Sequence, residues 1–246
     1  MANSAFERKF RQNAKRAGRR LVTYLADPQN EENVHEVRTS VRRLDSTFSL
    51  LPKKVRTRYR GRIEKYREFL RVSSRARDCD VIVGRVSTLG DLDTTDLQRK
   101  KRAELARATR LARSLKPLRP MRLAQDDRRI SKVAHRMIER IGKGLPTVLS
   151  HSSKVEELHR LRKDFRKLRY ILETVPAADR KRHMKKAARA AGRDLELKEL
   201  QALLGLIHDS DVTIKYLHGK PGAGRILKKE IGSRKQLYQK FVRHMK

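Results

Sequence analysis

Two segments of the chain carry apolar residues at intervals that alternate between three and four positions. The first segment contains Val34, Val37, Val41, Leu44, Phe48 and Leu51, and the second contains Leu158, Leu161, Phe165, Leu168 and Leu172. This spacing places the apolar side chains of each segment along one face of an α-helix. Each segment is therefore predicted to form an amphipathic helix whose apolar stripe packs into a core.

Good helix-forming residues fill most of the remaining chain. Ala, Leu, Arg, Lys and Glu dominate long segments, whereas Gly and Pro cluster at a few points. No run of alternating β-branched residues indicates a strand. We expect helices, with breaks near Gly90 and at Gly219–Gly224, over residues 4–26, 31–51, 54–76, 79–115, 126–149, 154–174, 178–207 and 210–242. This pattern predicts an all-α bundle protein.

Basic residues follow the apolar positions of both stripes. The first series is His35, Arg38 and Arg42, and the second is His159, Arg162, Arg166 and Arg169. Because consecutive residues of a helix are turned by about 100° from one another, each series forms a line along the border of the predicted buried face. Charges that served only solubility would be scattered over the opposite face. The two lines are therefore candidate binding residues.

The two segments are also copies of one motif. His35, Arg38, Arg42, Arg43 and Leu44 match His159, Arg162, Arg166, Lys167 and Leu168 at a constant offset, and residues 77–81 match residues 208–212. A repeat of this kind predicts two similar structural units. We expect one domain made of two tandem repeats, residues 1–120 and 121–246. Packing about a pseudo-two-fold axis would bring the two basic lines toward one groove.

The charge balance indicates a polyanionic partner. The chain of 246 residues has 63 Lys and Arg against 28 Asp and Glu, a formal net charge of +35. Charge sets the sign of a partner but not its identity, so nucleic acid and other polyanions both stay open. No stretch approaches the roughly 18 apolar residues of a membrane span, so we expect no membrane partner. The single cysteine, Cys79, excludes a disulfide scaffold and fits a reducing cytoplasm.

Other patterns that could indicate catalysis or metal binding are weak. The paired aspartates within residues 78–80 and 209–211 lack further acidic neighbours, so we expect them to cap helices or form salt bridges. Residues 219–226 approach a phosphate-binding loop, but Arg225 and Ile226 stand where that motif needs Lys and then Ser or Thr. No set of nucleophile, base and orienting group is visible. We therefore expect no enzyme activity, no metal and no cofactor.

Further basic residues step along other predicted helices. Arg11, Lys15 and Arg19 lie in the first helix, and Arg136, Arg140 and Lys143 lie in the corresponding helix of the second repeat. Two interpretations stay open for them. Either they line the same groove as the two basic lines, or they form solvated surface.

The paired His-x-x-Arg-x-x-x-Arg-[Arg/Lys]-Leu motifs, together with residues 197–212, resemble the CHAD domain, the conserved histidine α-helical domain. The resemblance covers essentially the whole chain. It implies two pseudo-symmetric four-helix bundles around a basic central cavity, binding of inorganic polyphosphate, and a location at polyphosphate granules. It also implies two groups of polyphosphate-facing residues, which we name the first basic line (His35, Arg38, Arg42 and Arg43) and the second basic line (His159, Arg162, Arg166, Lys167 and Arg169).

One position departs from the family pattern. Asp45 stands where the second repeat has Arg169, and where the family usually has a basic residue. Two consequences stay open. Either the first repeat holds the anion less firmly at that end, or Asp45 pairs with a neighbouring Arg.

Polyphosphate suits the two basic lines chemically. It offers dense negative charge and acceptor oxygens but no bases, Arg meets phosphate oxygens with a planar fork, and Lys supplies a point charge. Side chains one helical turn apart recur about every 5–6 Å, so successive residues can meet successive phosphates. Because nearby phosphate raises the pKa of a histidine, we expect binding through His35 and His159 to strengthen as pH falls from about 8 to about 6.

Nucleic acid is the alternative partner. The chain has six Phe, six Tyr and no Trp, and several Phe already belong to the apolar stripes, so few rings remain for base stacking. No known nucleic-acid-binding motif is visible. A protein that reads the shape of a duplex stays open. An enzyme that uses His35 or His159 as phosphate acceptor ranks last, because the acidic magnesium site of phosphoryl transfer is missing.

Overall fold

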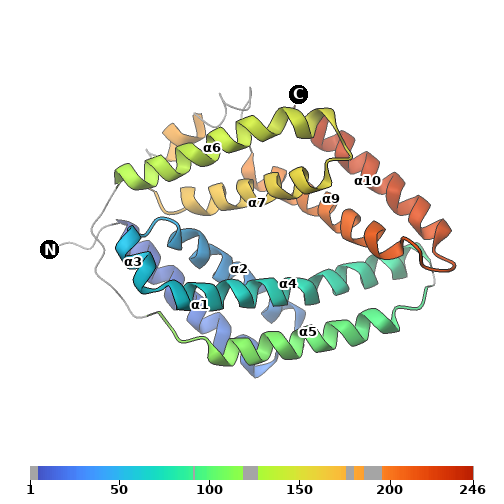
Figure 1. Cartoon of the computed structure of the whole chain (residues 1–246), viewed down its shortest axis with the longest axis horizontal. Helices are drawn as coiled ribbons and strands as arrows, with labels where there is room; N and C mark the ends of the chain where they lie inside the picture. The colour runs from blue at the N-terminus through green and yellow to red at the C-terminus, as the bar shows by residue number, and fades with distance from the viewer. Residues whose placement is uncertain (1–4, 91, 119–126, 176–179, 186–195, 246) are drawn as a thin grey trace. The chain divides into compact units, whose positions relative to one another are not determined.

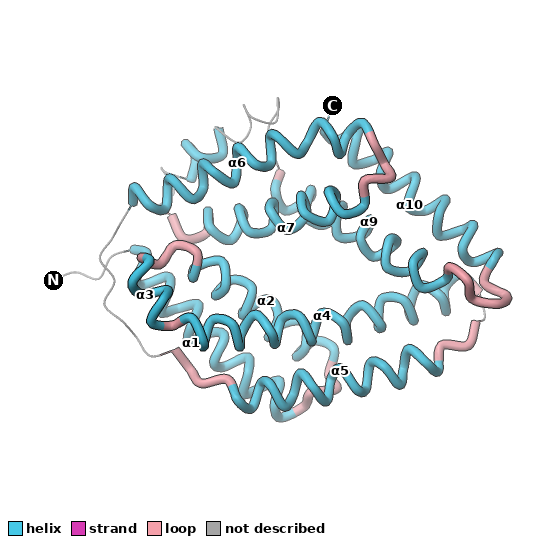
Figure 2. Tube along the Cα trace, in the orientation of Figure 1, coloured by secondary structure: helices cyan, strands magenta, loops and turns pink. Residues whose placement is uncertain are grey.

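Helices make up all the regular secondary structure in the described part of the chain (Figures 1 and 2). The computed structural model describes residues 5–90, 92–118, 127–175, 180–185 and 196–245, and all structural statements refer to these residues. The helices are α1 (Ala5–Ala26), α2 (Glu31–Phe48), α3 (Lys53–Arg58), α4 (Arg60–Leu89), α5 (Thr95–Ser114), α6 (Asp127–Ser150), α7 (Val155–Leu172), α9 (Leu197–Leu217) and α10 (Gly224–Met245). The predicted all-α class is confirmed.

The chain divides into two compact units that interleave along the sequence. Unit 1 consists of Met1–Arg77, Arg99–Val133 and Glu173–Pro176, and unit 2 consists of Asp78–Gln98, Ala134–Leu172 and Ala177–Lys246. Helices α4, α5 and α6 therefore each contribute one end to unit 1 and the other end to unit 2. The two tandem repeats expected from the sequence, and the cavity between them, stay predictions.

The first apolar stripe forms part of the core of unit 1. All its residues are buried, and Val37, Val41 and Leu44 are fully inaccessible to solvent. Helix α2 packs against α1. At this contact the ring centroids of Phe10 and Phe48 lie 6.2 Å apart. The predicted amphipathic helix is confirmed.

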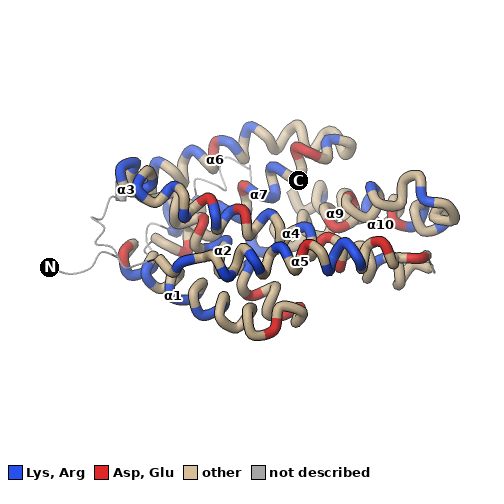
Figure 3. The backbone as a smooth tube through the Cα atoms, turned by 60° about the horizontal axis from the view of Figure 1, so that its bottom comes forward, with Lys and Arg blue, Asp and Glu red and all other residues tan. Residues whose placement is uncertain are grey.

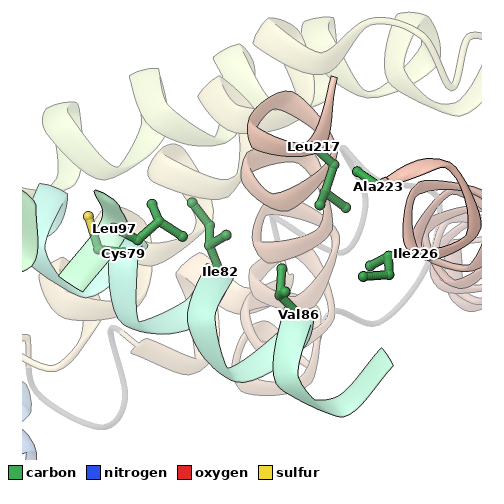
Figure 4. Close-up of a cluster of buried hydrophobic side chains, with 7 residues drawn as sticks. All are labelled: Cys79, Ile82, Val86, Leu97, Leu217, Ala223 and Ile226. Atoms are coloured by element: carbon green, nitrogen blue, oxygen red, sulfur yellow. The ribbon is translucent and has the colours of Figure 1, made fainter. Parts of the chain in front are cut away.

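The second apolar stripe forms part of the core of unit 2. All its residues are buried, and Phe165 and Leu168 are fully inaccessible to solvent. Helix α7, which carries the stripe, packs against α9, and α9 packs against α10. A further buried cluster of unit 2, drawn in Figure 4, contains Cys79, Ile82, Val86, Leu97, Leu217, Ala223 and Ile226.

Two predicted helix boundaries are wrong. Helix α4 runs unbroken through residues 77–79, and α9 runs unbroken through residues 208–210. Asp78 and Asp80 therefore lie inside a helix, where they cannot cap its start. The physical reason is the burial of neighbouring residues, which are spaced three or four apart and keep the helix continuous: Val72, Ala76, Cys79, Ile82 and Val86.

The acidic pair of the second repeat does not cap the start of a helix either. Asp209 and Asp211 lie inside α9, where the expected capping role is wrong. The alternative of a salt bridge is confirmed for Asp211, whose Oδ1 lies 2.6 Å from Nε of Arg234 on α10. Asp211 therefore connects α9 to α10 instead of starting a helix.

Two other local predictions are confirmed in the described residues. The helix ends at Leu89 just before Gly90, and α9 and α10 are separated by a loop in which Gly219 and Gly222 have φ of 75° and 73°. Both loop conformations lie in the left-handed region that glycine adopts without steric cost. Of residues 219–226, which approach a phosphate-binding motif, 219–223 therefore form a turn between two helices and 224–226 begin α10.

A buried ion pair connects three helices of unit 2. Arg85 on α4 pairs with Glu230 on α10, whose side chain is only 1% exposed. The Arg85 Nη1 also donates to Ser210 Oγ on α9 at 3.1 Å. A buried carboxylate is stable only while its partner compensates its charge, so this pair fixes the position of α10 against α4 and α9.

Glu230→Ala should therefore lower the free energy of unfolding by about 3 kcal/mol, because it leaves the Arg85 guanidinium without its carboxylate. Urea unfolding followed by circular dichroism measures the change. The double variant Arg85→Met with Glu230→Leu should recover most of the loss, since no unpaired charge remains. A loss under about 1 kcal/mol in the single variant would contradict the assigned role of the pair.

Candidate functional site

Positive charge alone does not mark a site on this chain. Lys and Arg occur on every described helix (Figure 3). A candidate site must therefore be recognised by side chains that packed helices hold in place. The members of the two basic lines differ in how firmly the packed helices of their own unit hold them.

The first basic line lies on α2 in unit 1. His35 is exposed, Arg42 and Arg43 are half-buried, and Arg38 is buried with 5% exposure. The Arg38 Nη2 donates to Ser74 Oγ on α4 at 3.1 Å. The first basic line therefore does not lie wholly at the border between core and solvent, because Arg38 in its middle is buried against α4.

Ion pairs occupy the C-terminal end of the first basic line. Arg43 Nε lies 3.2 Å from Glu173 Oε2. Asp45, which departs from the family pattern, accepts a hydrogen bond of 2.8 Å from Arg67 Nε on α4. The second of the two alternatives for Asp45 is therefore confirmed, since it pairs with a neighbouring Arg.

The second basic line lies on α7 in unit 2. All its members are half-buried, so the apolar stripe beside them holds them at the border between core and solvent. The Arg169 guanidinium lies over the ring of Tyr170, with its carbon 4.9 Å from the ring centroid, a favourable cation–π contact. These side chains are held in place by packing, unlike the exposed lysines of the same unit.

A histidine pair stands at the N-terminal end of the second basic line. Nδ1 of His159 lies 3.1 Å from Nδ1 of His208 on α9, and the ring centroids are 4.5 Å apart. One nitrogen must donate and the other accept, so the contact holds one proton. Sequence reasoning placed His208 in the repeated 208–212 motif but missed it as a site residue, because the contact joins two helices.

The environment of His159 disfavours its charged form. Burial is the main cause, and together with the nearby cations Lys163, Arg162 and Arg166 it lowers the pKa of His159 from 6.5 to about 4. His159 of the unliganded chain is therefore neutral at neutral pH. The expectation that binding strengthens between about pH 8 and about pH 6 now requires the anion itself to reverse this shift.

Some of the additional basic residues of α1 and α6 form ion pairs. Lys15 and Arg19 are exposed, and so are Arg136 and Lys143, so both interpretations stay open for these four. Arg11 and Arg140 form ion pairs. Arg11 Nη2 lies 2.6 Å from Glu7 on α1, and Arg140 Nη2 lies 2.6 Å from Asp164 on α7.

The three α1 residues do share one surface feature. Arg11, Lys15 and Arg19 line an open groove of about 490 Å³ together with Phe10, Ala14, Gly18, Val22, Pro117 and Leu118. This groove belongs to unit 1 and contains no member of the first basic line. The groove expected to join both basic lines stays a prediction, since the lines belong to different units.

Within the described residues, no three His, Cys, Asp or Glu side chains gather as a metal site. No helix described in the structure has the length and apolarity needed to cross a bilayer.

Comparison with known proteins adds a family. The family model described as "CHAD domain" matches residues 14–218. The match contains both basic lines and His208, and it ends before α10. No curated protein matches the chain.

The lowered pKa of His159 makes stability depend on pH. The unfolded chain protonates this histidine near pH 6.5, whereas the folded chain resists protonation down to about pH 4. The part of the free energy of unfolding that depends on a neutral His159 is therefore fully present above pH 6.5. It is lost as pH falls toward 4, because the unfolded chain takes up this proton more readily. The variant His159→Gln should lose less stability than the unmodified chain over this interval, measured as urea midpoints at about pH 7 and about pH 4.5.

A matched variant separates this histidine from the general acid sensitivity of the chain. His151→Gln changes an exposed histidine of the same unit and should keep the full pH dependence. Identical pH dependence in His159→Gln and His151→Gln would refute the assigned role of His159.

Proposed function

We propose that the chain, because it belongs to the CHAD domain family, binds inorganic polyphosphate and does not transform it. The observation that carries the proposal is the placement of the second basic line: half-buried cations held beside a buried apolar stripe, within the matched residues. A location at polyphosphate granules in the cytoplasm is part of the same proposal. Oligomeric state is no part of it.

Cationic side chains that packing holds in place bind a polyanion more strongly than mobile, exposed cations do. An exposed Lys or Arg is screened by salt and loses side-chain entropy when it binds, so it contributes little. A guanidinium fixed between packed helices has already lost that entropy. Charged hydrogen bonds contribute roughly 1.5–3 kcal/mol each under such conditions. Arg162 and Arg166 on α7 are the guanidinium groups to which this argument applies, since both are half-buried, and Lys167 beside them is also half-buried.

The proposed binding residues are the two basic lines with His208 added. In the first line, Arg42 is the better placed anchor, because Arg38 is buried and Arg43 faces Glu173. An anion that reaches Arg43 must compete with that carboxylate. In the second line, His159, whose lowered pKa keeps it neutral in the unliganded chain, can accept a proton as phosphate approaches, which would add charge at the contact.

Arg42→Ala combined with Arg166→Ala should weaken polyphosphate binding by at least about tenfold, equivalent to about 1.4 kcal/mol. These two half-buried residues occupy matching positions in the two repeats. Arg38 is left unchanged because its loss from a buried position would confuse folding with binding. Titration calorimetry at physiological salt measures the affinity, and circular dichroism checks the fold.

The control removes the same formal charge from exposed positions. Lys228→Ala combined with Lys240→Ala, both on α10, should change the affinity by less than about twofold. Equal losses in the two folded variants would mean that anion binding is diffuse. Tighter binding of duplex DNA or RNA than of long-chain polyphosphate at the same salt concentration would favour the alternative, nucleic-acid binding.

A further inference from the structure

An open pocket of about 460 Å³ lies in unit 2, at a distinct set of residues from the two basic lines. It is lined by residues of α7, α9 and α10: Val155, Asp211, Ile214, Lys215, His218, Ile231 and Arg234. Pockets that hold small molecules have volumes of about 300–1,000 Å³ and mainly apolar walls. The volume of this pocket lies within that range.

The walls of the pocket are aliphatic and partly exposed. Val155 and Ile231 are 37% and 47% exposed, and they are two of the few large apolar side chains that the described residues leave open to solvent. Ile214, which is half-buried, is the third aliphatic residue of the lining. Apolar side chains gathered at one exposed place typically mark a binding surface. A ligand that covers them gains the free energy of removing apolar surface from water.

An ion pair fixes the polar part of the pocket. Asp211 and Arg234 have side chains only 11% and 14% exposed, and Arg234 Nε lies 2.6 Å from Asp211 Oδ1. Arg234 Nη2 also donates to the Ser152 carbonyl oxygen at 2.9 Å. These contacts hold the guanidinium in place and compensate the single carboxylate of the lining. The exposed Lys215 and His218 complete the lining, and within the described residues no carboxylate forms an ion pair with Lys215.

The pocket depends on a helix outside the family match. The match ends at residue 218, whereas Ile231 and Arg234 belong to α10, which begins at Gly224. The pocket therefore exists because this chain packs α10 against α9. Its ligand need not be the polyanion of the proposed function.

We propose that this pocket binds a small amphipathic anion, with an aliphatic body against Val155, Ile214 and Ile231 and a carboxylate toward Lys215. The chemistry of the lining selects this class. A polyphosphate chain has no apolar body to cover the walls, a neutral alcohol leaves Lys215 without a counter-charge, and an amphipathic cation is repelled by it.

Decanoate, at concentrations below those at which it forms micelles, is the probe. Calorimetric titration should show that decanoate binds at least about tenfold more tightly than decanol, and that decyltrimethylammonium does not bind. Acetate, which has the charge without the apolar body, should also fail to bind. If decanol binds as tightly as decanoate, or acetate as tightly as decanoate, the proposed class of ligand is wrong.

Two matched pairs of variants test the location. Ile231→Ala should weaken decanoate binding about tenfold, whereas Leu206→Ala on α9, with 46% exposure against the 47% of Ile231, should leave it unchanged. Lys215→Ala should weaken it similarly, whereas Lys198→Ala, also exposed on α9, should not. All four residues are exposed, so the variants should fold. Equal effects within either pair would overturn the location.

Polyphosphate separates this inference from the proposed function. Saturating polyphosphate should not displace decanoate, and Ile231→Ala should bind polyphosphate with unchanged affinity. Displacement of decanoate by polyphosphate would overturn the inference that the pocket is a separate site. Loss of polyphosphate binding in the Arg42→Ala, Arg166→Ala variant has no bearing on decanoate, so either proposal can fail alone.

Discussion

Burial of the two apolar stripes is the interaction on which the candidate site depends. A helix is rigid, so once Val41 on α2 and Phe165 on α7 are fully inaccessible, the next residue of each helix stands about 100° away at the border of the core. These next residues are Arg42 and Arg166, and both are half-buried. Hydrophobic packing thus sets the position of the charges. A shift of one residue in either helix would move an Arg into the core at a large desolvation cost.

Three aspartates connect helices through specific Arg partners. Asp45 binds Arg67, Asp164 binds Arg140, and Asp211 binds Arg234, with each pair joining two helices. The net charge of +35 is therefore unevenly available to a ligand. Arginines in such pairs are locally compensated, so less of their charge is available to a ligand. This unevenness is why net charge predicts the sign of a partner but cannot locate its site.

Features that depend on local periodicity could be predicted from the sequence, and features that depend on contacts between helices could not. The apolar stripes, the all-α class and the break after Leu89 follow from spacing and from Gly. The continuity of α4 and α9 was misread, because Asp favours helix starts and only burial of the neighbouring stripe outweighs that preference. The His159–His208 contact joins residues 49 positions apart, and desolvation, the main cause of the lowered His159 pKa, has no signature in the sequence.

The two proposed ligands differ in the source of their binding free energy, and this difference allows both on one chain. Polyphosphate has only charge to offer, so its affinity comes from cations and released counterions and falls steeply with salt. An amphipathic anion gains chiefly from apolar burial against Val155 and Ile231, a contribution that salt does not screen. At high salt the binding of polyphosphate loses its driving force, whereas the binding of the amphipathic anion keeps most of it. Lys215 alone is too little charge to hold a polyanion, and the apolar stripes beside the basic lines are buried, so they offer little surface to an amphiphile.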